Sequence, residues 1–260
     1  MLISKGDRQA FPELRGDIRA MRYPAYVEAK CDGELNWFKP DKEYPYLINK
    51  SGKIRYSFPI TEELSHIKHR LLGELYWGDG KAGALYELLK HQTDNELKLM
   101  VFDVDIPGIY LERRMWLTKH ISPTPHVKIV DASKAMTKAD VERNYDYYVE
   151  RLHYEGIVVK SGDSRLIMGV CPWVKIKKKE TSDLPVAYID PTLERIDVWV
   201  QLSDDNRFGK MCGVKVMNKV KATLKVGDIV EIEHQGILSQ GGLRHPVFLR
   251  IREDKCAPVR

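Results

Sequence analysis

The spacing of apolar residues changes near residue 182, and this change limits what the chain can fold into. Up to residue 181, strand-like apolar runs alternate with segments whose apolar residues recur at helical spacing. After the basic run KIKKKETSDLP, only short segments with apolar residues at alternate positions follow, separated by glycine-containing turns. We therefore expect an α+β chain with a larger mixed domain at residues 1–181 and a small β domain at residues 182–260.

Particular helices and strands carry this expectation. The apolar residues of one helical face are Ile60, Leu64, Ile67 and Leu71 in PITEELSHIKHRLL, and Val141, Tyr145, Tyr148 and Leu152 in TKADVERNYDYYVERL. Thr137 with Asp140 is a start signal for the second helix. The strand residues expected to face a core are Ile196, Val198, Val200 and Leu202 in one segment, and Val247, Leu249 and Ile251 in another. Short strands in roughly 79 residues fit a small barrel, of which the oligonucleotide-binding type is one option.

Composition is that of a globular protein and narrows function only a little. The chain has 260 residues, is 43% hydrophobic, and contains neither a signal-like N-terminus nor a membrane-length apolar run, so we expect a cytoplasmic protein. Cys31, Cys171, Cys212 and Cys256 form no CxxC pair, which argues against a zinc knuckle or a disulfide framework. A net charge of +5 is compatible with a polyanionic partner but does not establish one. No GxxxxGK[ST] stretch supports a P-loop.

Charged side chains share faces on two predicted strands. Glu28 and Lys30 in YVEAKCDG lie two residues apart, so they project from the same face. Lys175 and Lys177 in PWVKIKKK project together in the same way, which suits a phosphate group. A lysine that is deprotonated is a nucleophile, and nearby cations would lower the pKa of Lys30.

The order of six fragments carries more information than any one of them. Glu74 lies in GELYWG, Phe102 in LMVFDVD and Glu155 in YEGIVVK, each beside a strand-like run, and each alone is explained by ordinary packing or capping. In chain order the fragments are K-x-D-G, G-E-L, V-F-D-V, E-G-I-V-V-K, W-V-K-I-K and R-H-P-x-F-x-R-I-R-E-D-K. This series resembles the covalent nucleotidyltransferase superfamily, specifically the ATP-dependent DNA ligases, from Glu28 to Lys255.

The resemblance implies a nucleotidyltransferase (adenylation) domain followed by an oligonucleotide-binding (OB-fold) domain. By similarity, Lys30 attacks the α-phosphorus of ATP to form lysyl-AMP, and Asp32, Lys175 and Lys177 assist. Glu28 would accept from the exocyclic amine of adenine. Phe102, which could also be ordinary core filling, resembles the aromatic residue that stacks on the base. Glu74 and Glu155 match acidic positions near the sugar and the metal, where Mg²⁺ or Mn²⁺ is expected.

The sequence departs from the ligase pattern at two positions. Lys50, in NKSGK, stands where these ligases carry an arginine that holds the 5′-phosphate of the nick. Leu35 stands where KxDGxR has another arginine, so either that contact is lost or Lys39, Lys53 or Arg55 reaches in instead. A lysine supplies charge but not a bidentate fork.

The C-terminal fragment resembles the last ligase motif, which orients the pyrophosphate leaving group. Arg250 and Arg252 alternate with Leu249 and Ile251, so both guanidinium groups are expected on one face, with Asp254 and Lys255 directly after them. The alternative is a charged barrel edge that discourages strand addition.

The resemblance therefore predicts a minimal, monomeric ATP-dependent enzyme that seals nicks in double-stranded DNA and has no membrane association. A helical domain before the first motif and a clasp inserted in the barrel are not expected, and the NAD-dependent class is disfavoured by the missing four-cysteine zinc site. Three alternatives stay open: an RNA ligase, an mRNA-capping guanylyltransferase, and an inactive nucleic-acid-binding module, the last because of Leu35 and Lys50.

Overall fold

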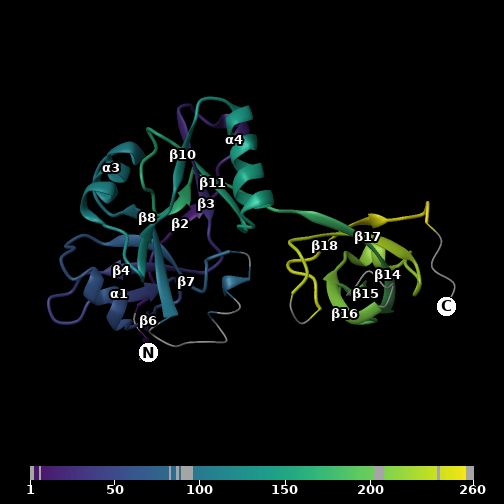
Figure 1. Cartoon of the computed structure of the whole chain (residues 1–260). Coiled ribbons are helices and arrows are strands. Elements are labelled where there is room, and N and C mark those ends of the chain that lie inside the picture. Colours follow the sequence, from purple (N-terminus) through teal and green to yellow (C-terminus); the bar gives the residue numbers. More distant parts are fainter. Residues whose placement is uncertain are drawn as a thin grey trace. The chain divides into compact units, whose positions relative to one another are not determined.

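The computed structural model describes residues 3–5, 7–81, 83–85, 88, 96–201, 208–238 and 241–255. The chain divides into two compact units, Met1–Lys177 and Lys178–Arg260, each of which has its own core (Figure 1). Cys256 and Leu202, named above, lie outside the described residues.

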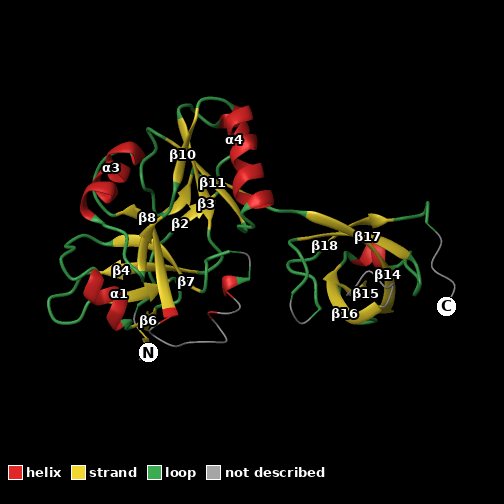
Figure 2. Ribbon diagram, in the orientation of Figure 1, coloured by secondary structure: helices red, strands yellow, loops and turns green. Residues whose placement is uncertain are grey.

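Within the part of the first unit that the structure describes, the strands form three sheets (Figure 2). The seven-stranded sheet has the order β1 (Ile3–Lys5), β6 (Lys53–Arg55), β5 (Tyr46–Asn49), β4 (Glu34–Lys39), β7 (Leu71–Trp77), β8 (Leu97–Val104) and β9 (Val127–Ile129). The four-stranded sheet has the order β10 (Ala132–Ala135), β3 (Ala25–Lys30), β11 (Gly156–Ser161) and β13 (Val174–Lys177). A small parallel pair joins β12 (Gly169–Cys171) to β2 (Pro12–Leu14).

Helices cover these sheets and complete their cores. They are η1 (Ile18–Ala20), α1 (Phe58–Glu63), α3 (Tyr110–His120), α4 (Lys138–Tyr145) and the π-helical turn η3 (Asp146–Arg151). Val141, Tyr148 and Val149 pack with Val27 and Val159 of the four-stranded sheet, and α4 lies beside β10 and β11 in Figure 1. The helix beginning at Thr137 is confirmed, because the Thr137 hydroxyl accepts from the Asp140 amide.

The other helix expected from periodicity is shorter than predicted. Helix α1 ends at Glu63, and Leu71 is the first residue of β7 instead of the last turn of a helix. Ile60, Leu64 and Ile67 are nevertheless all buried in one core with Leu71. These four residues come from a helix, a turn and a strand, but all of them reach one core. Their spacing in the sequence therefore matched that of one longer helix.

The turn after Lys30 carries the chain from one sheet to the other. Strand β3 ends at Lys30 in the four-stranded sheet, and β4 begins at Glu34 in the seven-stranded sheet. A Cβ atom on Gly33 would lie 2.3 Å from the Leu75 carbonyl oxygen and 2.8 Å from Glu74 Cγ, so only glycine fits. Gly33 therefore allows the turn after β3 to pass close to β7.

The second unit is a five-stranded antiparallel sheet in the order β16 (Phe208–Lys215), β15 (Arg195–Gln201), β14 (Glu180–Ile189), β17 (Ile229–His234) and β18 (Val247–Ile251), with α5 (Asn218–Lys221) between β16 and β17. Ile196, Val198 and Val200 are buried as expected. Closing a barrel requires pairing between the edge strands β16 and β18, and no such ladder is present within the described residues. The OB-fold therefore stays a proposal.

In the last strand the expected core-facing position is confirmed for Ile251 and wrong for Val247 and Leu249. Val247 and Leu249 are 51% and 45% exposed, whereas Phe248 and Ile251 pack against the core. Glu231 pairs with Arg250 and Ile232 pairs with Phe248, so Leu249 is an extra residue in the ladder. This β-bulge reverses which residues face inward. In the described parts of the chain, no helix is long and apolar enough to cross a membrane.

Candidate active site

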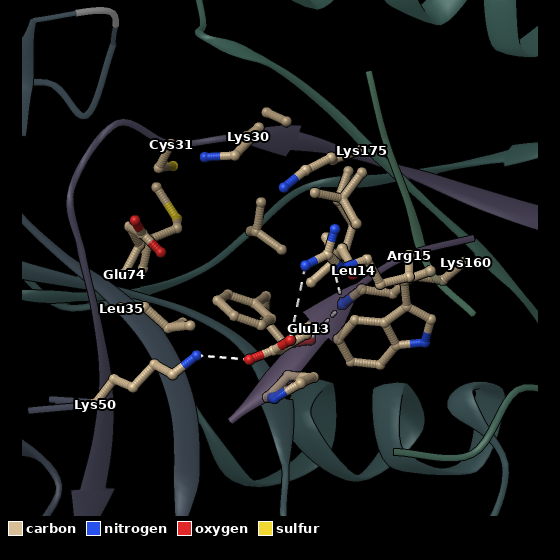
Figure 3. Close-up of a pocket in the computed structure, with 18 residues that line it drawn as sticks. Glu13, Leu14, Arg15, Lys30, Cys31, Leu35, Lys50, Glu74, Lys160 and Lys175 are labelled. Atoms are coloured by element: carbon tan, nitrogen blue, oxygen red, sulfur yellow. Dashed lines mark hydrogen bonds and ion pairs between the residues drawn. The ribbon is translucent and has the colours of Figure 1, made fainter. Parts of the chain in front are cut away.

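A cavity of about 450 Å³ lies in the first unit, between β3 and β13 of one sheet and β4, β7 and β8 of the other. Its lining includes the predicted residues Glu28, Lys30, Lys50, Glu74, Phe102 and Lys175. In Figure 3, Lys30 and Lys175 enter from the upper side of the view, and Lys50 and Glu13 enter from the lower side. The fold thus brings residues that are far apart in sequence to one concave surface of the size that small ligands use.

Lys30, which lines this cavity, is held by the carboxylate of Glu155, which, like Lys177, is absent from the lining. Its Nζ forms an ion pair with one Glu155 oxygen, and Lys177 Nζ lies 2.5 Å from the other. Glu155 directly precedes β11, whose Gly156 pairs with both Lys30 and Lys177 across the sheet. The Glu155 carboxylate therefore lies between Lys30 of β3 and Lys177 of β13, the two strands that flank β11.

The charges around Lys30 favour its protonated form. Burial by itself lowers the pKa of the ammonium, but the carboxylates of Glu155 and Glu74, with a smaller contribution from Asp32, outweigh burial and raise that pKa. The expectation that nearby cations such as Lys175 and Lys177 leave Lys30 with a lowered pKa is therefore wrong for this structure, because the carboxylates around Lys30 dominate. Lys177 shares its carboxylate partner, Glu155, with Lys30.

Glu74, on β7, has a raised pKa. Burial raises the pKa of its carboxyl to about 7, although the nearby Lys30 ammonium acts in the opposite direction. The Glu74 carboxyl is therefore readily protonated near neutral pH, in contrast to Glu155, whose two lysine partners hold its pKa below the ordinary value.

Asp32 has a structural role next to Lys30. Its side chain is buried and accepts from the Gly83 amide at 2.7 Å, and its own amide donates to the Gly80 carbonyl at 3.1 Å. Asp32 is absent from the cavity lining. The aspartate of KxDG thus fixes the turn that presents Lys30, by binding the segment that follows β7.

Phe102 and its neighbour Asp103 have different contacts on β8. The half-buried Phe102 ring lines the cavity and packs against the cores on both sides of it. The buried Asp103 carboxylate instead receives Arg113 of α3 in a bidentate pair, with Nε at 2.7 Å and Nη2 at 3.1 Å. This ion pair connects α3 to the strand that carries Phe102.

Around Leu35, none of the cations proposed from the sequence lines the cavity. Arg55 is fully buried, lies 2.8 Å from Glu34 and is absent from the cavity lining. Lys39 and Lys53 are also absent from the lining. Arg15, which follows β2, does line the cavity together with Leu35 and Lys50. This arginine was missed because the resemblance begins at Glu28.

Lys50 is paired in this structure. Its Nζ lies 2.7 Å from a Glu13 oxygen, and both side chains are exposed (Figure 3). Arg15 Nη2 lies 4.0 Å from the other Glu13 oxygen. An exposed pair of this kind is weak, so an incoming phosphate can compete with Glu13 for both cations.

The charged residues of the last fragment lie in the second unit and form their own network. Arg250 Nε lies 2.6 Å from Glu231, and Arg252 Nη1 and Lys255 Nζ each lie 2.6 Å from Asp183. Asp254 accepts from Arg252. Asp183 and Glu231 are cross-strand partners, so both guanidinium groups reach carboxylates on the same face of the sheet.

Neither a family model nor a curated protein matches the sequence, but solved structures match the fold. A Lig E DNA ligase matches with a TM-score of 0.74 at 15% identity, over 94% of this chain and 99% of its own. The chain has the fold of DNA ligases. The protein Pmar-Lig_Pre matches at 0.73 and 19% identity, over 94% of this chain and 67% of its own. A mycobacterial DNA ligase D complexed with ATP and MES matches at 0.54 and 17% identity, over 95% and 96%.

Proposed function

We propose that the protein is an ATP-dependent DNA ligase that seals 5′-phosphate/3′-hydroxyl nicks in duplex DNA through lysyl-AMP on Lys30. The observation that carries this proposal is the position of the Lys30 amine at a cavity that also receives Glu28, Glu74, Phe102 and Lys175. The fold shared with DNA ligases supports it.

The first step is nucleophilic attack by Lys30 Nζ on the α-phosphorus of ATP. The N–P bond forms while the bond to the pyrophosphate oxygen breaks, and the ammonium must release its proton to solvent beforehand. Its ion pair with Glu155 opposes that release. The phosphates of bound ATP would pair with Lys175, which lines the cavity. They would also compete with Glu155 for Lys177. The AMP then passes to the 5′-phosphate, and the 3′-hydroxyl displaces it.

The oxygen donors near Lys30 provide only part of the ligand set that a divalent cation needs. The described residues contain no group of three or more histidine, cysteine, aspartate or glutamate side chains arranged to hold a metal. Glu74 and Glu155 supply two carboxylates, and burial raises the pKa of Glu74, so a bound cation would favour its ionised form. Mg²⁺ or Mn²⁺ bound with ATP would neutralise phosphate charge there.

The second unit completes the proposed enzyme. We assign the larger domain (residues 1–181) to nucleotidyl transfer and the smaller one (182–260) to an OB-fold that meets DNA as part of a monomer. Arg250, Arg252, Asp254 and Lys255 would orient pyrophosphate in the first step. Lys50 and Arg15 would hold the 5′-phosphate of the nick, because Leu35 cannot.

The decisive experiment measures mass after incubation with ATP and Mg²⁺. The protein should gain one AMP, Lys30→Ala should gain none, and Lys119→Ala, an exposed position on α3, should behave like the native chain. Labelling by GTP instead of ATP would indicate a capping enzyme, and sealing of RNA nicks alone would indicate an RNA ligase. A native chain that gains no nucleotide would be a binding module, and the proposal would be wrong.

A further inference from the structure

Glu28 is held from two sides by donors that the sequence fragments do not identify. Lys160 Nζ on β11 lies 2.6 Å from Glu28 Oε2, and the Tyr110 hydroxyl on α3 donates to Oε1 at 2.6 Å. Only 2% of Glu28 is exposed, and the residue lines the cavity. Each carboxylate oxygen keeps one further acceptor site, because an ionised carboxylate accepts about four hydrogen bonds.

Lys160 is buried between a carboxylate, a carbonyl oxygen and three aromatic rings. Its side chain is fully buried, donates to the Phe102 carbonyl oxygen at 3.2 Å, and lies over the Trp173, Phe102 and Tyr110 rings at 4.1, 4.8 and 5.1 Å. Aromatic faces stabilise an ammonium but do not neutralise it. Glu28 is the only carboxylate recorded against Lys160 within the described residues. A buried ion pair of this kind requires both charges, because removing one leaves the other uncompensated.

Tyr110 supports the same state of Glu28. Burial, together with the charge of Glu28, raises the pKa of the Tyr110 hydroxyl well above its ordinary value, so this group stays a donor. With an ammonium and a hydroxyl both donating to it, Glu28 can offer a ligand acceptor sites only. A nucleobase at this wall must therefore present a hydrogen-bond donor.

We propose that Lys160 and Tyr110 are positioning residues that hold Glu28 as a fixed acceptor and thereby make the cavity prefer 6-aminopurine over 6-oxopurine nucleotides. This inference rests on the proposed function, in which Glu28 meets the base. The exocyclic amine of adenine donates to the carboxylate. In inosine, a 6-oxygen takes the place of this amine, and its lone pairs face the Glu28 carboxylate. A site that accepts a hydrogen bond at this position disfavours a ligand that has no donor there.

Removing the ammonium should make the site less selective for the base. In Lys160→Met, Glu28 keeps only the Tyr110 donor, so the carboxylate loses the ion pair that fixes its second oxygen. A carboxylate that is held on one side only no longer presents a fixed acceptor to the amine of adenine.

The experiment compares ATP, inosine triphosphate and purine riboside triphosphate as donors for lysyl-nucleotide formation, and as ligands in calorimetry. Losing a hydrogen bond to a charged group changes affinity by about 10- to 100-fold, and we expect Lys160→Met to lose that much of the ATP-to-inosine preference. Purine riboside triphosphate has neither the 6-amine nor the 6-oxygen, so its affinity should be the same for the native chain and for this variant. A loss of affinity for all three nucleotides by one factor would indicate a merely structural role for Lys160.

Tyr110→Phe removes only the hydroxyl, so it tests the same inference if Lys160→Met fails to fold. It should lower the ratio of ATP affinity to inosine triphosphate affinity by a smaller factor. Tyr148→Phe is the matched control, because its hydroxyl contacts Ser133 outside the cavity lining. Native ratios in both Lys160→Met and Tyr110→Phe would overturn the inference. Selective ATP binding without any lysyl-AMP would contradict the proposed function alone, and failure to bind any of the three nucleotides would overturn both.

Discussion

The proton on Lys30 controls when its amine can react. Because Glu155 raises the pKa of Lys30, the free amine should increase by about tenfold per pH unit below that pKa, and lysyl-AMP formation with it. Glu155→Gln removes a negative neighbour, so the inflection should move to lower pH even if the plateau falls. Lys177→Met leaves Glu155 entirely to Lys30, so the inflection should move to higher pH. Single-turnover adenylation across pH tests this, and one shared inflection in all three proteins would refute it.

Glu74 should make the folded chain less stable at alkaline pH. Its folded pKa of about 7 exceeds the ordinary 4.5, so the folded state binds the proton more tightly than the unfolded state does. The stability from that proton is fully present below pH 4.5 and is lost as the pH rises through 7. Without nucleotide, Glu74→Gln should therefore unfold at higher urea than the native chain above pH 7, and the difference should vanish in acid. Glu142→Gln, on exposed α4, is the control, and a pH-independent difference would contradict the assignment.

At the scale of residues, sequence reasoning succeeded where a motif names a side chain that its strand directs into the cavity. Lys30, Glu28 and Glu74 were found in this way, and their roles stay predictions. Arg15 and Tyr110 were missed, because they reach the site through the fold and lie outside the recognised fragments. A contact between distant segments leaves no periodic signal in one sequence.

At the scale of elements, the errors came from local irregularities. The bulge at Leu249 shifts the inward-facing positions of β18 by one residue, and no glycine or proline in VFLRI signals it. Helix α1 ends at Glu63, although apolar spacing continues to Leu71, because side chains from successive elements share one core. Periodicity reports which residues are buried more reliably than which element carries them.

The ion pair between α3 and β8 should matter for stability more than any surface charge on that helix. Arg113→Ala leaves the buried Asp103 without its bidentate partner, and breaking such a pair typically costs about 3–5 kcal/mol. Because α3 also carries Tyr110 and β8 carries Phe102, nucleotide binding should weaken together with stability. Urea unfolding and ATP titration check both effects. Lys119→Ala on the exposed side of α3 should change neither, and an Arg113→Ala chain as stable as the native one would rule out this role.

At the scale of the whole molecule, the sequence predicted a mixed unit followed by a β unit, and the structure divides after Lys177 into two such units. The barrel expected for the second unit is not confirmed, because closure depends on pairing between the edges of β16 and β18, which the alternation within either strand does not report. Likewise, a net charge of +5 gives no location for a DNA-binding face.

The two chemical stages should differ in their sensitivity to salt. DNA binding through lysine and arginine releases counterions, so the logarithm of affinity should fall with that of salt by about 0.9 for each neutralised phosphate. Lysyl-AMP formation depends on the buried and half-buried charges around Lys30, which salt screens much less. With subsaturating nicked duplex, sealing should therefore fall steeply as salt rises, while adenylation by ATP falls only slightly. Saturating DNA should restore sealing at high salt, which separates lost binding from lost chemistry. If sealing were insensitive to salt, or if both stages fell in parallel, phosphate contacts would not be the main source of DNA affinity.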